Sequence, residues 1–442
     1  MLEVTAMLFF LLVAVSVQGA FLPVTSTSYV PEQIHLSYAE TPDSMYVVWT
    51  TPTATAQPYV TYSLNKSGAP TTTVQATTRT FTNDDWDIAP NTALMNYCAK
   101  MTGLQTGQLY KYQVGSSKGM SASFVFRALR DFTSSPAKLV FYGDLGVGPE
   151  QTLTLATLKT QASAYAYDAI FQIGDYAYNM NSNAGATGDE FFRDIQPVAS
   201  ILPYMGVQGN HEGPDYSGTP HWVNRFKMPG DNNNMWYSMD FGLVHVIGLS
   251  TELTYFNDPQ QAVQYSAIQA DLEAVDRSRT PWVVATFHRP MYCSINPSND
   301  EDYYEDGPGP FTTRIKDCTI SAPLIRKVWE DLLYKYKVDI LMNAHVHTYE
   351  RLNPAYNNQA ASNAYTSLHL IKGAGAPLTI VTGMAGQAES YATLSSTPLP
   401  WSVAQSNEKG FGLLQAYNSS AILYQQLSSS DLSVLDYLWL FK

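Results

Sequence analysis

Five short apolar segments after residue 136 each end in a residue type that binds metal ions. Stretches of helical periodicity, roughly 10–15 residues long, separate several of these segments, and this alternation predicts an α/β layer architecture. In an open α/β sheet, ligands bind in the crevice beyond the carboxyl ends of the strands. The pattern therefore predicts that the side chains at the segment ends converge on one crevice. These side chains are Asp144, Asp175, Asn210, His288 and the pair His345 and His347.

The residue types in these five blocks suit a pair of metal ions. A single Asp after Gly at a strand end is usually a turn, so the prediction depends on the joint pattern. His345 and His347 are two apart on an extended segment, which directs both side chains to the same side. Carboxylate, carboxamide, imidazole and phenolate groups together favour two hard-to-intermediate ions over a lone structural zinc. The blocks read Gly143-Asp144-Leu145-Gly146, Gly174-Asp175-Tyr176-Ala177-Tyr178, Gly209-Asn210-His211-Glu212, Val284-Ala285-Thr286-Phe287-His288 and His345-Val346-His347.

In this order, the blocks closely resemble those of the purple acid phosphatases, a branch of the calcineurin-like metallophosphoesterases. Two positions depart from the family spelling, because Ala285 stands where Val is usual and Ala344 where Gly is usual. Neither position supplies a ligand. The resemblance implies a chain that mixes α+β and α/β architecture. A fibronectin type III-like β-sandwich would come first, followed by a metallophosphoesterase β-sandwich flanked by helices in βαβαβ units.

The resemblance also implies a role for each site residue. His211 would contact the phosphate and help to protonate the leaving group, and Glu212 would be its orienting partner. Asp175 would bridge a ferric ion and a divalent ion, which is Zn, Mn or Fe. The other implied ligands are Asp144, Tyr178 and His347 for the ferric ion, and Asn210, His288 and His345 for the divalent ion.

The activity that the resemblance implies is hydrolysis of small phosphate monoesters by a metal-bound hydroxide, as in an acid phosphatase. Family members commonly offer further histidines after the fourth block, but the loop from Ser294 to Pro310 is acidic and has none, so those substrate contacts are not carried over. A secreted metallophosphodiesterase and a non-catalytic phosphate-binding or storage relative stay as alternatives. A protein serine/threonine phosphatase is disfavoured. Its second block continues Gly-Asp-x-Val-Asp-Arg-Gly, where this chain has Tyr176-Ala177-Tyr178-Asn179.

The first part of the chain has a different texture. A chain of 442 residues is too long for one ordinary core, so we expect two domains. Residues 28–128 consist of short β-branched and aromatic runs with turn signals, which predicts a β-sandwich. The segment from Gly103 to Val114 resembles a fibronectin type III strand, and this resemblance implies a tyrosine corner at Tyr110 and Trp49 in the core. The change of texture after Arg130 places the catalytic domain, with its C-terminal segment, at 136–442.

Charge and terminal composition restrict partners and location. The formal net charge of −13 argues against nucleic acid or an anionic membrane as a partner, and nothing in the composition specifies an oligomeric state. An apolar run within residues 1–19 predicts a signal peptide, and no later run is long enough to span a membrane. We therefore expect a secreted protein, or one in the lysosomal or vacuolar lumen.

The cysteines and the two Asn-x-Ser tripeptides are consistent with a protein that is exported from the cytosol. Of three cysteines, Cys293 and Cys318 lie in the same domain, and a bridge between them suits an oxidising compartment. Cys98 is left over, either as a small buried hydrophobe, which we favour, or as an intermolecular thiol. Asn65 and Asn418 begin Asn-x-Ser tripeptides, so both are candidate glycosylation sites.

Overall fold

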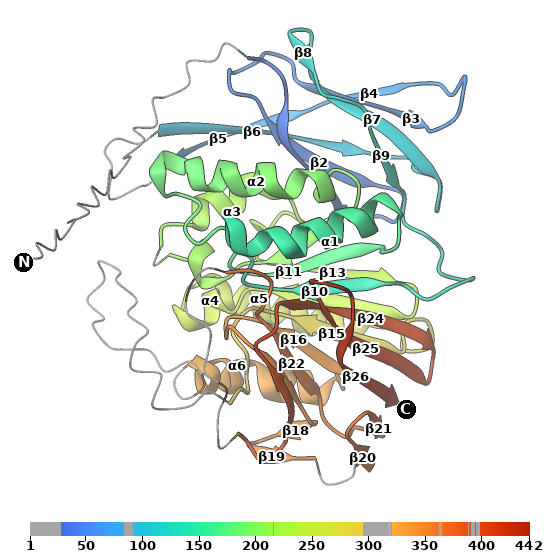
Figure 1. The fold of residues 1–442 in the computed structure, drawn as a ribbon, viewed down its shortest axis with the longest axis vertical. Helices are drawn as coiled ribbons and strands as arrows, with labels where there is room; N and C mark the ends of the chain where they lie inside the picture. The colour runs from blue at the N-terminus through green and yellow to red at the C-terminus, as the bar shows by residue number, and fades with distance from the viewer. Residues whose placement is uncertain are drawn as a thin grey trace, which may run out of the picture.

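The computed structural model is shown in Figure 1. It describes residues 28–83, 92–214, 216–294, 318, 321–361, 365–387, 389, 394 and 398–442. The expected signal peptide at 1–19 lies outside the described residues, as does the acidic loop beyond Ser294. Within the described ranges, none of the helices is both long and apolar enough to cross a lipid bilayer.

The first part of the chain is a sandwich of two antiparallel sheets, at the top of Figure 1. Trp49 and Tyr97 are completely buried in its core, and the Tyr110 hydroxyl accepts a hydrogen bond from the Gln105 N–H at 2.9 Å, which is the expected tyrosine corner. One sheet has the order β1 (Glu32–Tyr38), β2 (Met45–Thr50), β6 (Thr92–Met101), β5 (Thr77–Asn83). The other contains β4 (Thr72–Gln75), β3 (Tyr59–Leu64), β7 (Leu109–Ser116) and β8 (Gly119–Met120), with β9 (Phe124–Arg127) also paired to β7.

The second part is a larger sandwich of two mixed sheets. The eight-stranded sheet has the order β12 (Tyr204–Val207), β11 (Ala169–Ile173), β10 (Leu139–Tyr142), β24 (Gly410–Asn418), β25 (Ala421–Ser428), β26 (Val434–Phe441), β21 (Leu370–Lys372), β20 (Tyr365–Ser367). The seven-stranded sheet has the order β13 (Trp236–Phe241), β14 (Val244–Leu249), β15 (Trp282–Thr286), β16 (Ile340–Asn343), β22 (Leu378–Thr382), β17 (Tyr349–Leu352), β23 (Ser402–Ser406). A short hairpin joins β18 (Ala355–Tyr356) to β19 (Gln359–Ala360).

Parallel strands lie at one side of the eight-stranded sheet and in the middle of the seven-stranded sheet. β10, β11 and β12 run parallel, as do β14, β15, β16 and β22. Their residues are almost all buried, which explains why they appear in the sequence as continuous apolar runs. The connecting helices are α1 (Thr152–Ser163), α2 (Ala186–Ala199), α3 (Thr219–Arg225), α4 (Glu252–Tyr255), α5 (Gln260–Ala274) and α6 (Ala322–Lys335).

The helices lie on the outer faces of the sandwich. Leu158 of α1 and Ile195 of α2 belong to the same apolar core as β10 and β11, whereas Ile268 of α5 and Trp329 of α6 pack with β14 and β15. In Figure 1, α1 and α2 lie between the larger sandwich and the N-terminal sheets. This arrangement is the predicted fold class, a β-sandwich followed by a second sandwich flanked by helices.

A buried polar network joins the two parts. The completely buried guanidinium of Arg225 donates to Asp189 at 2.7 Å and to Gln33 on β1 at 3.2 Å, and the ring of His35 contacts the Arg225 carbonyl at 3.0 Å. The Tyr112 hydroxyl donates to the Ser200 carbonyl at 2.8 Å. Because buried polar groups are costly to leave unpaired, these contacts fix the N-terminal sheets against the helices next to the predicted crevice.

Candidate metal centre

The carboxyl ends of parallel strands from both sheets meet at one edge of the larger sandwich. The N–H of Gly143, just after β10, donates to the carbonyl of Thr382 at the end of β22, at 2.9 Å. Parallel strands in register place their end residues side by side at the same edge. The predicted residues therefore come together from five strand ends, at Asp144, Asp175, Asn210, His288 and His345.

One cluster contains Asp144, Tyr178 and His347. The Tyr178 hydroxyl lies 2.8 Å from Nε2 of His347 and 3.2 Å from Oδ1 of Asp144, and Nε2 of His347 lies 3.4 Å from the same Oδ1. Asp144 and His347 are buried. Three donor atoms of different chemistry thus face a common point.

A second cluster surrounds His288. Its Nε2 lies 2.9 Å from Oδ1 of Asn210, 3.2 Å from Oδ2 of Asp175 and 3.1 Å from Nδ1 of His345. Candidate ligand atoms of Asp175, His288 and His345 lie within 4.8 Å of one another, and so do those of Asp144, Asp175 and His347. Asp175 is the member that both groups share.

Two glycines make the close approach of these loops possible. A Cβ atom on Gly174, which has φ +81°, would lie 2.5 Å from Nδ1 of His288. A Cβ on Gly143 would lie 2.3 Å from the Cβ of Ala344. Asp144 and Asp175 themselves have positive φ values of 58° and 50°, an uncommon conformation that costs free energy and clusters at functional sites.

Hydrogen bonds behind the clusters orient the imidazoles. Nδ1 of His288 lies 2.7 Å from the carbonyl of Ile173, so it donates there and directs Nε2 toward the cluster. The buried guanidinium of Arg289 donates to Glu252 at 3.0 Å, and its Nη1 lies 3.1 Å from Nε2 of His345. These contacts fix the ring planes of both histidines.

The electrostatics of the site are those of a buried charge cluster. Burial alone would raise the pKa of Asp175, but the neighbouring His288, His211 and His345 hold the pKa of this carboxyl well below its usual range. Burial would lower the pKa of His288, but the carboxylate of Asp175 raises it to about 10. Each charged partner therefore depends on the other, and buried charges of this kind are paired or coordinate metal ions.

His211 lies at the rim of the second cluster. Its Nε2 lies 3.9 Å from Oδ2 of Asp175 and 3.9 Å from Oε1 of Glu389, while its Nδ1 lies 3.0 Å from Oδ1 of Asn179. The ring stacks on that of Tyr216, with centroids 4.3 Å apart. Burial lowers the pKa of His211, although Asp175 opposes the effect. The geometry directs Nε2 toward the centre and anchors Nδ1.

Glu212 was expected to orient His211, but its carboxylate contacts backbone N–H groups. Its carboxylate accepts hydrogen bonds from the backbone N–H groups of Asp175 at 2.8 Å, Tyr176 at 2.9 Å and Gly209 at 3.1 Å. Complete burial and the charge of Asp175 raise the pKa of Glu212 to about 8. Glu212 therefore ties the Asp175 loop to the Asn210 loop, and Asn179 is the side chain that holds His211.

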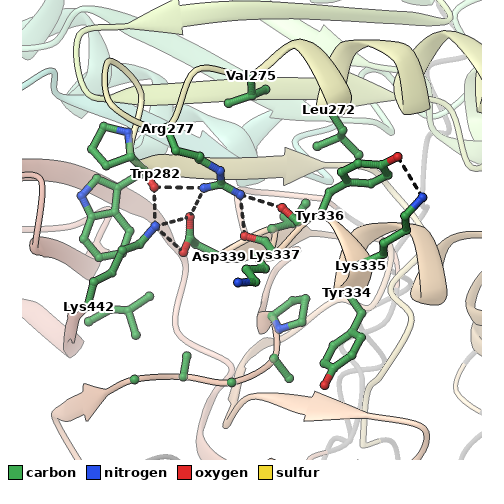
Figure 2. A pocket seen from close by; sticks show the side chains of 18 of the residues that line it. Leu272, Val275, Arg277, Trp282, Tyr334, Lys335, Tyr336, Lys337, Asp339 and Lys442 are labelled. Carbon is green, nitrogen blue, oxygen red and sulfur yellow. Dashed lines mark hydrogen bonds and ion pairs between the residues drawn. The ribbon is translucent and has the colours of Figure 1, made fainter.

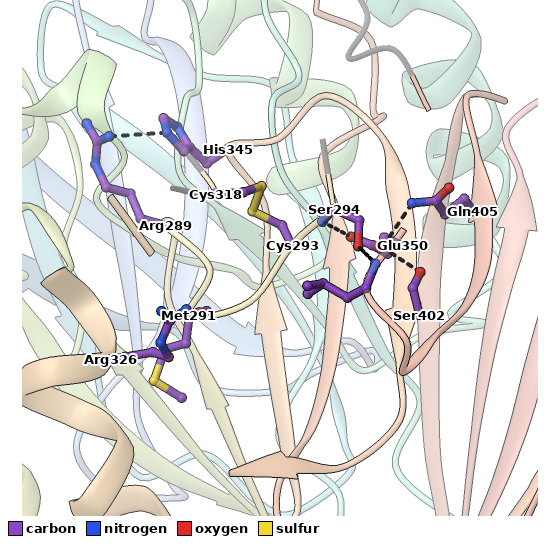
Figure 3. The surroundings of a disulfide bond; sticks show 11 residues. Arg289, Met291, Cys293, Ser294, Cys318, Arg326, His345, Glu350, Ser402 and Gln405 are labelled. Atoms are coloured by element: carbon purple, nitrogen blue, oxygen red, sulfur yellow. Dashed lines mark hydrogen bonds between the residues drawn. A yellow bond between two sulfur atoms is a disulfide. The ribbon is translucent and has the colours of Figure 1, made fainter. Parts of the chain in front are cut away.

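The disulfide lies close to His345 of the fifth block, as Figure 3 shows. Cys293 and Cys318 are bridged, with their Cα atoms 5.3 Å apart, and Cys98 is buried and free, as predicted. The bridge packs against Val346, which lies between His345 and His347. Ser294 donates its N–H to Glu350 at 2.8 Å. The chain after His288 is thus attached to the strand end that carries the last two candidate ligands.

Comparison with known proteins assigns the chain to a family. Residues 31–128 match the purple acid phosphatase N-terminal domain, residues 137–349 match the calcineurin-like phosphoesterases, and residues 376–437 match the C-terminal region of iron/zinc purple acid phosphatase-like proteins. Acid phosphatase type 7 from Homo sapiens is 35% identical over 98% of this chain and 95% of its own length.

The chain belongs to the purple acid phosphatase family.

Two further relatives show the range of this family. A purple acid phosphatase from yellow lupin (Lupinus luteus) seeds has a similar solved structure, with a TM-score of 0.78, 26% identity, and coverage of 93% of this chain and 74% of that one. A probable inactive purple acid phosphatase, number 27 of Arabidopsis thaliana, is 28% identical over 90% of this chain and 67% of its own length. The purple acid phosphatase family therefore includes relatives that are named as probably inactive. Whether a member can catalyse hydrolysis depends on the residues at its metal centre.

Sequence analysis of this purple acid phosphatase missed four residues near the site: Asn179, Tyr216, Arg289 and Glu389. Asn179 and Arg289 directly follow Tyr178 and His288, so their positions beside predicted ligands were an available signal. Tyr216 and Glu389 reach His211 from turns outside the five blocks, and the sequence offered no comparable signal for them.

Proposed function

We propose that this protein is an acid phosphatase that hydrolyses phosphate monoesters at a centre of one ferric and one divalent ion (Zn, Mn or Fe). The observation that carries the proposal is the pair of buried clusters that share Asp175. A carboxylate common to two groups of donor atoms is what a bridged two-metal site requires.

The residues present fit such a pair of ions. The cluster of Asp144, Tyr178 and His347 supplies a carboxylate, a phenol and an imidazole, and anionic oxygen donors suit a hard ferric ion. The cluster around His288 supplies two imidazoles and a carboxamide oxygen, which suit a divalent ion of intermediate hardness. Asp175 supplies a second carboxylate between the two clusters.

When bound, the two ions would activate water and offset the negative charge that develops on the oxygens of the phosphate. The chain contributes orientation and proton transfer. His211 holds Nδ1 against Asn179 and presents Nε2 to the centre, so a proton on Nε2 is placed for donation to the departing alkoxide. Glu212 keeps the Asp175 and Asn210 loops at a fixed separation through three backbone N–H groups.

Two other functions are weighed against this one. A metallophosphodiesterase would share the same metal-binding residues. A non-catalytic phosphate-binding or storage protein has support from the relatives that are named as inactive. Against the second alternative, the side chains of the seven residues that we propose as ligands lie close together, and His211 lies beside them. A complete set of donors favours catalysis.

We also propose the domain boundaries, the glycosylation sites and the location that the sequence predicts. The division into a signal peptide at 1–19, an N-terminal domain at 28–128 and a catalytic domain at 136–442 is retained. Asn65 and Asn418 are exposed, which fits glycosylation, and the disulfide fits an oxidising compartment. We therefore place the protein outside the cell or in a lysosomal or vacuolar lumen.

Turnover of p-nitrophenyl phosphate and of bis(p-nitrophenyl) phosphate by the purified, metal-loaded protein tests the proposal. We expect the monoester to be hydrolysed with the higher kcat/KM. Faster turnover of the diester would favour the phosphodiesterase, and no turnover of either compound would favour the non-catalytic protein.

A further inference from the structure

A cavity lies at the edge of the sandwich opposite the metal centre. Its volume is about 1030 Å³, and it lies where β15, β16 and β22 begin, next to the carboxyl end of α6. The candidate ligands follow the carboxyl ends of β15 and β16 instead. Strands of four or five residues separate the two sites by about 15 Å. The cavity is therefore separate from the metal centre, and its size is that of a small-molecule site.

Positive charge gathers in this cavity, although the whole chain carries a formal charge of −13. Its walls include four basic side chains and one acidic side chain, that of Asp339. Figure 2 shows Arg277 and Lys442 on either side of this carboxylate, with contacts of 2.9 and 2.8 Å. Arg277 also donates to the carbonyls of Tyr336 and Lys337, at the end of α6. The side chain of Asp339 therefore pairs with two cations, and the contacts of Arg277 hold this part of the wall in place.

Lys337 supplies a cation that this network does not neutralise. Its side chain is exposed on the cavity wall, and within the described part of the chain no carboxylate lies within ion-pair distance of its ammonium group. The backbone at Lys337 has φ 53°, where the N–H groups of Lys337 and Val338 close the end of α6 on the carbonyls of Tyr334 and Leu333. This position of a helix end normally carries Gly. A lysine in this backbone conformation costs free energy of folding relative to glycine, and it places a long cation on the cavity wall.

The other walls are apolar or aromatic. Leu272 and Val275 come from the end of α5, and Val338 precedes β16. Tyr334 is 39% exposed, and its ring is held by stacking on Tyr356 with centroids 3.9 Å apart. A flat, preordered aromatic surface beside a free ammonium group suits a ligand that has an apolar body and an anionic end.

We propose that this cavity is a binding site for a small organic anion with a flat apolar body. Lys337 contacts the anionic group, and Tyr334, Val275 and Leu272 contact the body. The site is independent of the metal centre and of the activity proposed for it.

The probe for this site is 8-anilinonaphthalene-1-sulfonate, an aromatic anion whose fluorescence rises when it leaves water. Titration of the full chain, with saturating orthophosphate present to occupy the metal centre, should give one site per chain. Lys337→Gln should raise the Kd about tenfold, because a charge-assisted contact is lost. Lys327→Gln, the same change at an exposed position earlier on α6, should leave the Kd within about twofold.

A third variant separates binding from folding. Lys337→Gly removes the ammonium group but relieves the backbone, so it should weaken binding while the melting temperature stays the same or rises. Naphthalene-2-carboxylate should displace the probe, and acetate, which lacks the apolar body, should not. The proposal is overturned if Lys337→Gln and Lys327→Gln behave alike, if the probe is absent from the protein once orthophosphate is bound, or if acetate competes as well as the aromatic acid.

Discussion

The hydroxyl oxygen of Tyr178 lies 2.8 Å from Nε2 of His347, whereas the hydroxyl of Tyr176 points into the core. Tyr176 donates to the carbonyls of Gln172 at 3.2 Å and Val207 at 3.1 Å and is completely buried. The two tyrosines are two positions apart, but the backbone turns between them, with φ 52° at Tyr178. This geometry supports Tyr178 as the phenol of the proposed metal centre.

Replacement of Tyr178 should therefore remove the colour of the oxidised, iron-loaded protein. A phenolate bound to a ferric ion gives a charge-transfer band in the visible region. We expect Tyr178→Phe to abolish this band while some activity survives on the remaining ligands. Tyr176→Phe is the matched control and should retain the band. A colourless iron-loaded wild type, or a band that disappears with Tyr176, would contradict the assignment.

Gly143 should tolerate no side chain in this protein. A Cβ at this position would lie 2.3 Å from that of Ala344, closer than real carbon atoms approach. Gly143→Ala should lower the free energy of unfolding by about 1–3 kcal/mol, the usual cost of overpacking. Adding Ala344→Gly should recover part of this loss, because the nearest contact then disappears. Urea unfolding of the single and double variants measures both effects, and equal stabilities would disprove the packing argument.

The sequence predicted where the site lies better than it predicted the contacts within it. Strand ends marked by Asp, Asn or His converge because parallel strands share an edge, a rule that needs only the order of the blocks. The partner of His211 depends instead on the local turn that brings Asn179 to its Nδ1. A separate short turn, Asn210–Glu212, directs Glu212 to backbone N–H groups, and a motif does not encode that direction.

The sheet order shows a similar limit. β24 (Gly410–Asn418) pairs antiparallel with β10 (Leu139–Tyr142), across more than half of the chain. Both strands are apolar and buried, so their composition predicts strands but does not specify which strand is the neighbour. Tyr110 is different, because its corner contact to Gln105 is local in sequence and could be predicted from the segment itself.

His245 should make stability depend on pH. Burial would lower its pKa, but hydrogen bonds to Asp240 at 2.6 Å and Asp271 at 2.9 Å raise it to about 9. A pKa raised above the unfolded value of about 6.5 stabilises the folded state fully below pH 6.5, and the effect is lost as pH rises toward 9. Because Asp240 is half exposed, screening should limit the contribution to about 1–2 kcal/mol.

The difference in unfolding free energy between wild type and His245→Gln isolates this contribution from other titrating groups. We expect the difference to be largest near pH 5.5 and to shrink by pH 9.5. A difference that stays constant across this range would show that the ring is not charged in the folded protein.

Metal content of purified Asp175→Asn, measured together with that of His211→Ala, tests the two-metal centre most directly. Wild type should hold two ions per chain. Asp175→Asn should lose both together, because the shared carboxylate serves both clusters and its charge offsets the repulsion between the ions. His211→Ala should retain both ions while kcat falls by about 10²–10⁴, the usual effect of losing a general acid. Retention of one full ion by Asp175→Asn, or equal metal loss in both variants, would contradict a centre bridged by Asp175.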